Sequence, residues 1–407
     1  MSAGPRHYRF LDALRGIAVL GVVAVHTVQN FPWRRAEPVL YYGAFGVTLF
    51  YIVSAFSLCL SLDQRRRVER HPILNYAIRR FFRIAPMFYV AIVIYLLKPL
   101  VLPARSAPVI LDPITWSLER WHVLVTALFV NGWHYQSINL VVPGGWSVAV
   151  ETNFYLLLPF LFRRATSLRR ALTLTGASII ASVVLRKVLY LLVASRIPPA
   201  DMPGLNVFAG LWLPNQLPVF MLGIVMFRLV DRAALAEPEK ISGRRVAAVY
   251  AGLVAAVLFV RFAPPRAERL FSEHFQIATV LLFGSLLLAY RPYRLLVNSV
   301  TAYIGRVSYS VYLMHFVALQ LVLWTARSWF TPTFHATVPL AVAFPVVLAL
   351  AVAISSVTYR LIELPGQKLG QYFIARLEKS AAPTVVAPVA AVETPSVPPR
   401  VTDGPAV

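Results

Sequence analysis

The sequence has few of the features that stabilise or charge a soluble domain. Cysteine occurs once, as Cys59, so no disulfide within the chain is possible. Charged residues make up only 14% of the 407 residues, and 17 acidic residues stand against 39 Lys and Arg. A soluble domain carries about a quarter of its residues as charged side chains. The shortage of charge therefore points away from a soluble globular protein.

Apolar residues are abundant instead. Hydrophobic residues make up 58% of it, and the mean hydropathy is +0.66. Runs long enough to cross a bilayer occur ten times, at residues 10–28, 41–62, 85–102, 146–162, 171–194, 214–230, 245–262, 274–290, 308–326 and 337–360. A further apolar stretch, 121–130, is too short to span. The sequence predicts an all-α polytopic membrane protein with about ten transmembrane helices.

The excess of positive charge indicates topology rather than nucleic-acid binding. The net charge is +22, but the basic residues form short clusters between apolar runs. Nineteen Lys and Arg lie in the even-numbered connections and nine in the odd ones, which by the positive-inside rule places both termini in the cytoplasm. The expected location is the inner cell membrane, and no cleavable signal peptide is expected.

Two regions are expected along the chain. Residues 1–366 contain the apolar runs and form the predicted transmembrane domain. Residues 367–407 form a cytoplasmic C-terminal segment, and from about residue 381 Ala, Pro, Val and Thr dominate without amphipathic period. We expect that last part to be disordered.

The first apolar run contains three ionisable residues, Asp12, Arg15 and His26. Asp12 and Arg15 are three residues apart, at ion-pair spacing on a helix. The eleven residues from Arg15 to His26 bring both side chains to nearly the same face, about 16 Å apart along the axis. Intramembrane ionisable groups usually mark a functional site. The alternative is a boundary ion pair and an interfacial histidine, but the shared face favours a site.

A basic cluster precedes the third run. It contains Arg79, Arg80 and Arg83, and the last two share a face of a probable helix. Positive-inside anchoring explains such clusters in general. Two arginines on one face also suit a multiply charged phosphate ligand, so both interpretations stay open.

The fourth run begins with the segment GGWSVAVETNFY, which places Glu151 more than one turn inside an apolar helix. The same segment carries the further candidates Trp146, Ser147 and Tyr155. An unpaired carboxylate at that depth needs a partner or a proton, and His26, in the same half of the membrane, is a permitted partner. In the ninth run, His315 is another intramembrane ionisable group.

These segments carry a resemblance to a known family. In the same order, LDALRG followed by a histidine, FGVTLFYIVSAF, RRFFRIAP, WSVAVETNFYLLLP, SYSVYLMH and YRLIELP resemble the membrane O-acyltransferases of acyltransferase family 3. The resemblance covers about residues 8–366. It departs at Ala55 and Val148, where the family more often has glycine and leucine.

The resemblance implies ten helices, an acyl donor that is usually cytoplasmic acyl-CoA, and a hydroxyl acceptor on a glycan, a lipid-linked sugar or a small natural product. The matching functional positions are Arg15, His26, Arg80, Arg83 and Glu151. Acyl transfer from a thioester needs a base, groups that stabilise an oxyanion, and positioning. It needs no metal, and we expect no permanently bound cofactor; acetyl-CoA is the expected donor substrate.

The expected roles follow from that chemistry. His26 is the base or a transient acyl carrier, and Glu151 orients its imidazole. Arg80 and Arg83, next to Arg79, hold the donor phosphates, and Arg15, held by Asp12, lines the path or polarises the thioester carbonyl. Acylation of a small hydroxylated metabolite, such as an antibiotic sugar, is the alternative within the enzyme class. A proton-coupled transporter is the alternative from another class.

Overall fold

The computed structural model describes residues 8–31, 37–102, 118–230, 241–262, 271–329 and 340–380. Within these ranges the chain is helical and contains no strand. The longer helices are α1 (Arg9–Asn30), α3 (Gly46–Arg65), α4 (Pro72–Val101), α6 (Gly145–Arg164), α7 (Leu168–Val193), α9 (Leu213–Leu229), α11 (Gly243–Phe262), α12 (Glu273–Tyr290), α14 (Ser308–Trp329), α16 (Leu340–Thr358) and α17 (Leu364–Ser380). The shorter ones are α2 (Glu37–Leu40), η1 (Tyr41–Phe45), α5 (Arg120–Ala127), η3 (Asn131–Trp133), η4 (Ala194–Arg196), η5 (Pro199–Asp201), α8 (Met202–Leu211), α13 (Ser299–Arg306) and η8 (Tyr359–Glu363).

The prediction of an all-α polytopic membrane protein is confirmed. Nine helical segments of the described ranges are long and apolar enough to span a bilayer. They are Arg9–Asn30, Tyr41–Arg65, Pro72–Val101, Leu168–Val193, Pro199–Leu229, Gly243–Phe262, Glu273–Tyr290, Ser308–Thr325 and Leu340–Lys379. The tenth expected span lies on α6, which has 20 residues but is made less apolar by Glu151 and Asn153. The short stretch 121–130 forms α5 and the turn after it, as expected.

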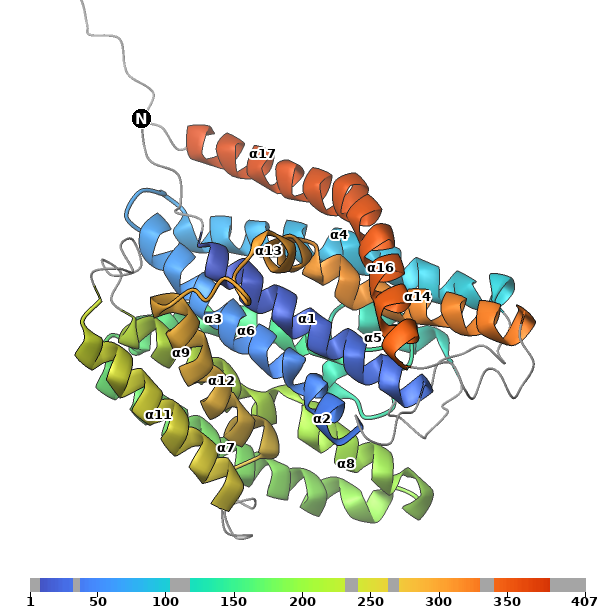
Figure 1. The fold of residues 1–407 in the computed structure, drawn as a ribbon, viewed down its shortest axis with the longest axis horizontal. Coiled ribbons are helices and arrows are strands. Elements are labelled where there is room, and N and C mark those ends of the chain that lie inside the picture. Colours follow the sequence, from blue (N-terminus) through green and yellow to red (C-terminus); the bar gives the residue numbers. More distant parts are fainter. Residues whose placement is uncertain are drawn as a thin grey trace, which may run out of the picture.

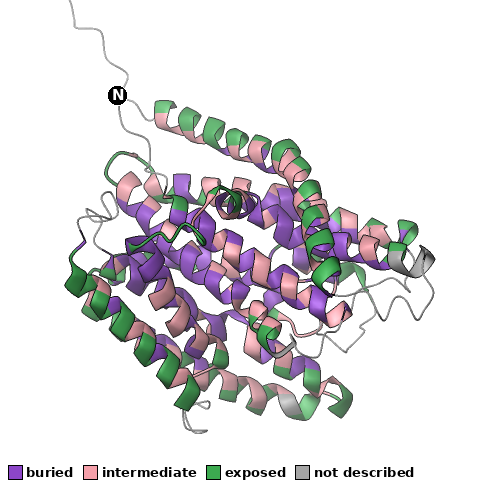
Figure 2. Cartoon of the chain, in the orientation of Figure 1, coloured by how far each residue is buried: buried purple, intermediate pink, exposed green. Residues whose placement is uncertain are grey.

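Helix α1 lies in the middle of the bundle and packs against α3, α13, α14 and α16 (Figure 1). Two glycines allow its close contact with α13. A Cβ on Gly305 would lie 1.7 Å from the carbonyl oxygen of Asp12, and one on Gly16 would lie 2.1 Å from that of Thr301. By contrast, α7 and α11 lie at the edge of the bundle with many exposed side chains (Figure 2). On α1, Asp12 is therefore buried by protein, and Arg15 and His26 are partly buried.

Two helices extend beyond the predicted spans. Helix α4 begins at Pro72, so Arg79, Arg80 and Arg83 lie on its helical turns. Helix α16 continues through the π-helical turn η8 into α17, which packs along α4. Phe373 stacks on Phe82 with ring centroids 5.4 Å apart. The first part of the expected C-terminal segment is thus a docked helix, and residues 381–407 lie outside the described ranges.

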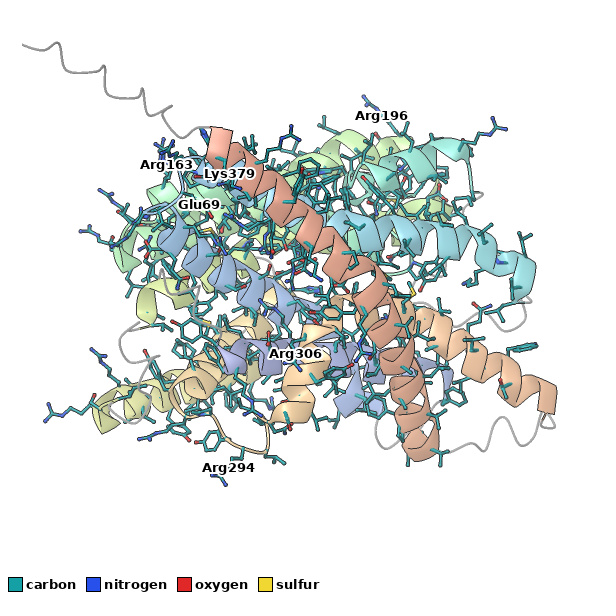
Figure 3. All side chains as sticks on the ribbon, turned by 90° about the horizontal axis from the view of Figure 1, so that it is seen from above. Glu69, Arg163, Arg196, Arg294, Arg306 and Lys379 are labelled. Atoms are coloured by element: carbon teal, nitrogen blue, oxygen red, sulfur yellow. The ribbon has the colours of Figure 1, made fainter. Side chains whose placement is uncertain are left out.

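Figure 3 labels six charged side chains from the connections and helix ends. Arg163 and Arg294 come from connections predicted to be cytoplasmic, and in this view they lie toward one end of the molecule together with Glu69 and Lys379. Arg306, from another such connection, lies near the middle of the view, and Arg196, from a connection predicted to be external, lies further toward the other end. The cytoplasmic placement of the termini stays a prediction.

Candidate functional site

Two cavities lie along α1. We call the first the arginine cavity; it has a volume of about 70 Å³ and its polar lining residues are Arg15, Tyr51, Ser54, Ser57, Arg80, Arg83, Ser147, Glu151, Tyr155, Ser308, Tyr309 and Tyr312. We call the second the histidine cavity; it has a volume of about 700 Å³ and lies around His26. Val47 and Tyr312 line both cavities. The two cavities therefore meet at these two side chains.

Arg15 lies on the inward face of α1 and is held by two contacts. Its guanidinium donates to Asp12 Oδ1 at 3.2 Å, which is the ion pair expected from their spacing. It also donates to Ser57 Oγ on α3 at 2.9 Å. Asp12 is itself buried and does not line the cavity. The pair fixes Arg15 with its charge at the cavity wall, because a hydrogen-bonded guanidinium is held in one orientation.

Arg80 and Arg83 reach the same cavity from α4. Neither side chain makes a hydrogen bond or an ion pair with another residue of the described ranges, and the Nε of Arg80 is buried without a partner. Buried donors without partners are uncommon in folded proteins. With Arg15, these side chains place three guanidinium groups against one carboxylate, that of Glu151. The cavity is thus suited to an anion.

Arg79 differs from its two neighbours. It donates to both carboxylate oxygens of Glu69, at 2.8 and 3.0 Å, and does not line the cavity. Arg65 donates to Glu69 as well, at 3.0 Å. Partial burial opposes the charged form of Glu69, but the hydrogen bonds from Arg79 and Arg65 prevail and lower its pKa. The structure therefore separates Arg79 from the phosphate-binding group in which the sequence placed it.

Glu151 lies in the arginine cavity, on α6. Its Oε1 accepts hydrogen bonds from Ser54 Oγ on α3 and from the Tyr155 hydroxyl one turn along α6, each at 2.5 Å. The expected contact with His26 is not present: among the described residues no hydrogen bond joins the two, and they line different cavities. Ser147, one turn before Glu151, donates a hydrogen bond to Tyr312. The side chain of Tyr312 lines both cavities and stands where the cavity of Glu151 meets that of His26.

His26 lies on α1 at the wall of the histidine cavity. Its Nδ1 is 3.0 Å from Gln29 Oε1, three residues along the same helix. Its ring lies 4.5 Å from the ring of Phe316 and stacks at 5.3 Å on that of His315. Nε2 of His26 has no hydrogen-bond partner among the described residues. This nitrogen is therefore available to a ligand, as a base requires.

His315 supports the imidazole without lining either cavity. It is 1% exposed, and its Nδ1 lies 2.6 Å from the carbonyl oxygen of Tyr312. Its Nε2 is buried with no partner among the described residues. The structure thus brings the two sequence-predicted histidines together, because α14 packs directly against α1.

Tyr312 is a site residue that the sequence analysis missed, as it also missed Gln29 and Ser54. Its hydroxyl accepts from Ser147 Oγ at 2.7 Å and donates to the carbonyl oxygen of Gly144 at 3.0 Å. Gly144 has φ of +75°, and a Cβ there would lie 2.9 Å from the Tyr312 hydroxyl, so glycine permits the contact. The available signal was the spacing of three residues from Tyr312 to His315, which places both on one helix face. Trp146, which follows Gly144 in the segment that begins α6, lines the histidine cavity.

Comparison with known proteins agrees with the resemblance seen in the sequence. Residues 8–360 match the model of a family described as an acyltransferase domain. The chain belongs to this acyltransferase family. The described residues that line both cavities lie within the matched range.

Curated relatives carry related names. The chain is 23% identical over 399 residues to O-acetyltransferase OatA of Staphylococcus aureus, with 92% of this chain and 60% of the relative aligned. It is 28% identical over 160 residues to peptidoglycan O-acetyltransferase OatA of Listeria monocytogenes, over 37% of this chain and 23% of that protein. The chain thus spans three-fifths or less of these relatives' lengths. No solved structure matches it.

Proposed function

We propose that the chain transfers an acyl group, expected to be acetyl, from acyl-CoA to a hydroxyl group of a glycan or lipid-linked sugar. The observation that carries this proposal is the meeting of two unlike cavities at Val47 and Tyr312. One holds arginines without partners among the described residues, which suits a polyanionic donor, and the other holds an imidazole, which suits a hydroxyl acceptor. The names of the relatives support O-acetylation of a carbohydrate.

The donor would bind with its phosphates at Arg80 and Arg83. These side chains lie on α4 toward the end of the bundle that the charge distribution places in the cytoplasm, where acyl-CoA is found. The arginine cavity, at about 70 Å³, is too small for a whole acyl-CoA, so most of the donor would lie outside it. The thioester would then lie near Tyr312, with the hydrogen-bonded guanidinium of Arg15 along the path.

The acceptor would react from the histidine cavity. With Gln29 Oε1 as acceptor, Nδ1 of His26 carries the proton and Nε2 keeps its lone pair. Nε2 takes the proton of the acceptor hydroxyl as its oxygen attacks the thioester carbon. The carbon–sulfur bond then breaks, the ester forms, and the proton passes to the leaving sulfur to give free coenzyme A. A covalent acyl-imidazole route uses the same nitrogen as nucleophile.

The role first expected for Glu151 changes with its position. Because it bonds Ser54 and Tyr155 within the arginine cavity, we propose that it positions the donor channel rather than the imidazole. Membership of an acyltransferase family supports this enzyme over the proton-coupled transporter. Acylation of a small hydroxylated metabolite would use the same two cavities with another acceptor.

The test uses purified protein in lipid nanodiscs with radiolabelled acetyl-CoA. We expect the wild type to bind the donor and release coenzyme A, and His26→Ala to bind equally but to react about 10²–10⁴-fold more slowly, the usual contribution of a general base. His71→Ala, an exposed histidine outside both cavities, is the matched control and should react normally. A wild type that neither binds nor turns over acyl-CoA would refute the proposal.

A further inference from the structure

A third cavity lies between α4 and α6, beside the arginine cavity. It has a volume of about 320 Å³, and we call it the lateral groove. Its main lining residues are Ala77, Arg80, Phe81 and Ile84 of α4 and Tyr155 and Leu156 of α6. Arg80 is the one cation among its described lining residues, and none of them is acidic. The lateral groove thus combines a largely apolar wall with a single positive charge.

The rim of the lateral groove consists of apolar side chains that other residues leave uncovered. Ile73, Phe81 and Leu156 are 49%, 51% and 77% exposed. Contiguous exposed apolar surface marks a contact with another molecule or with a membrane. Because α4 is one of the membrane-spanning helices and α6 carries a further expected span, lipid chains are the surroundings that this rim meets. The lateral groove therefore opens sideways, toward lipid.

The floor of the lateral groove is held in place by hydrogen bonds. The Tyr76 hydroxyl donates to the carbonyl oxygen of Tyr155 at 3.1 Å and so joins α4 to α6. At the far end, Phe129 stacks on Phe88 of α4 with ring centroids 4.9 Å apart. Arg80, Ile84 and Tyr155 line both the lateral groove and the arginine cavity. The lateral groove is therefore preformed, and it shares a wall with the arginine cavity.

Arg80 lies at the depth expected for the phosphate of a lipid. The apolar run of this helix begins at Ala85, five residues or about 7.5 Å after Arg80 along the axis. The headgroup region on each side of the hydrocarbon core is about 5–7.5 Å thick. The Nε of Arg80 is buried without a partner among the described residues. A phosphate oxygen would supply both the missing acceptor and the missing negative charge.

We propose that the lateral groove binds one phospholipid from the leaflet nearest Arg80, with its phosphate at Arg80 and part of one acyl chain between α4 and α6. From Arg80 the chain follows Phe81, Ile84 and Ala85 toward Phe129, along side chains without charge. At about 320 Å³ the lateral groove holds part of a lipid, and the rest stays in the bilayer. A guanidinium has five N–H donors, so Arg80 keeps donors for a ligand in the arginine cavity.

The test measures labelling of the protein in nanodiscs by two photoactivatable lipids, with the labelled peptides mapped by mass spectrometry. Both probes carry a diazirine in one acyl chain; one is a phosphatidylglycerol and the other a diacylglycerol, which has no phosphate. We expect the phospholipid to label the peptides of α4 and α6 that line the lateral groove at least about fivefold more strongly than the diacylglycerol, since a hydrogen bond to a charged group contributes about 1.5–3 kcal/mol.

Two pairs of variants locate the bound lipid. Ala77→Trp places a large side chain in the lateral groove and should reduce phospholipid labelling there at least about fivefold, whatever the fold-change with the other probe. Val93→Trp is its matched control, because Val93 is an exposed apolar residue of the same helix outside the lateral groove. Arg80→Gln should reduce phospholipid labelling about tenfold and leave diacylglycerol labelling unchanged. Arg79→Gln, whose arginine bonds Glu69 instead, should change neither.

Equal labelling by the two probes would overturn the inference, as would a groove signal that survives Ala77→Trp or Arg80→Gln. Losses of the same size in Val93→Trp or Arg79→Gln would also overturn it, because the effect would then not belong to the lateral groove. The experiment contains no acyl donor, so its outcome is independent of the proposed function.

Discussion

The arginine cavity and the histidine cavity share two lining residues, yet their charges and their hydrogen bonding differ. Around the arginine cavity, Arg80 and Arg83 have no partner among the described residues, and a ligand must supply the negative charge. Around the histidine cavity, the polar groups are oriented by neighbours, as Gln29 orients His26. One cavity presents guanidinium groups without partners among the described residues, and the other presents an imidazole that a neighbouring side chain orients.

The contrast explains how one bundle can keep two substrates apart until they react. Long-range attraction toward the arginines acts on a polyanion and not on a sugar hydroxyl. The hydrogen bonds of the Tyr312 hydroxyl to Ser147 and Gly144 fix the side chain at which the cavities meet. Separate recognition with a single meeting point favours reaction between the two ligands at that point.

The largest effect on donor binding should come from removing the charge of the arginine cavity. Arg80→Gln and Arg83→Gln should each weaken acetyl-CoA binding about 10- to 100-fold, since a hydrogen bond to a charged group contributes about 1.5–3 kcal/mol. Acetylpantetheine, which lacks the phosphates, should bind the variants as it binds the wild type. Equilibrium binding of both labelled donors to protein in nanodiscs checks this.

Arg79→Gln is the matched control for these variants. Arg79 belongs to the same cluster but donates both its hydrogen bonds to Glu69, so the affinity for acetyl-CoA should change little. An equal loss of affinity in all three variants would mean that general positive charge, rather than the arginine cavity, attracts the donor.

The sequence alone predicted the charged residues of the arginine cavity and His26 of the histidine cavity, but not Glu273, which also lines the histidine cavity. Asp12, Arg15, His26 and Glu151 were evident because a charge in an apolar run is rare and costly. Glycines in α1 and α13 also fit the close packing found there, although which helices meet was not predictable. The geometry of a single helix was therefore enough to predict the Asp12–Arg15 ion pair. It was not enough to predict contacts between helices.

The role of Tyr312 and the separation of Glu151 from His26 depend on such contacts between helices. Gln29 lies on the same helix as His26, but a glutamine at that distance is ordinary in sequence. Tyr312 becomes recognisable only when α14 brings it beside Ser147 and Gly144. The pairing of Arg79 with Glu69 likewise requires the turn between α3 and α4.

A smaller effect should follow from changing the partner of the imidazole. Gln29→Leu removes the group bonded to His26 Nδ1 and should reduce the rate of acyl transfer about tenfold with no change in donor affinity, because both the tautomer and the ring orientation are released. Gln29→Glu keeps an acceptor oxygen and should retain most of the rate. Turnover at saturating donor measures both; a normal rate in Gln29→Leu would show that the contact does not position the base.

Tyr312→Phe should have a still smaller effect. It removes the hydroxyl bonded to Ser147 and Gly144 but keeps the ring at the boundary. Because the ring keeps its place and only neutral hydrogen bonds are lost, transfer should fall about fivefold, which corresponds to about 1 kcal/mol. Because the boundary loosens, the fraction of acetyl-CoA that is hydrolysed rather than transferred should rise. The ratio of ester to free acetate, measured with a glycan acceptor, tests the effect. An unchanged ratio would separate Tyr312 from the reaction.

The smallest effect concerns the basic cluster outside the arginine cavity. The hydrogen bonds from Arg79 and Arg65 overcome the effect of burial and lower the pKa of Glu69, so the charged form is favoured in the folded protein. The stabilisation from this carboxylate is therefore fully present above its unfolded pKa, near 4.5, and is lost as the pH falls through the lower folded value.

Glu69→Gln removes that dependence. The variant should have a Tm about 1–2 °C lower than the wild type at pH 7, since partly exposed ion pairs contribute less than about 1 kcal/mol. The difference should shrink as the pH approaches 4, while acetyl-CoA affinity at pH 7 stays unchanged because Arg79 lies outside the cavity. Glu119→Gln is the control and should show no such trend. If Glu69→Gln instead weakened donor binding, the cluster and the arginine cavity would form one electrostatic unit, and the distinction between Arg79 and its two neighbours would be wrong.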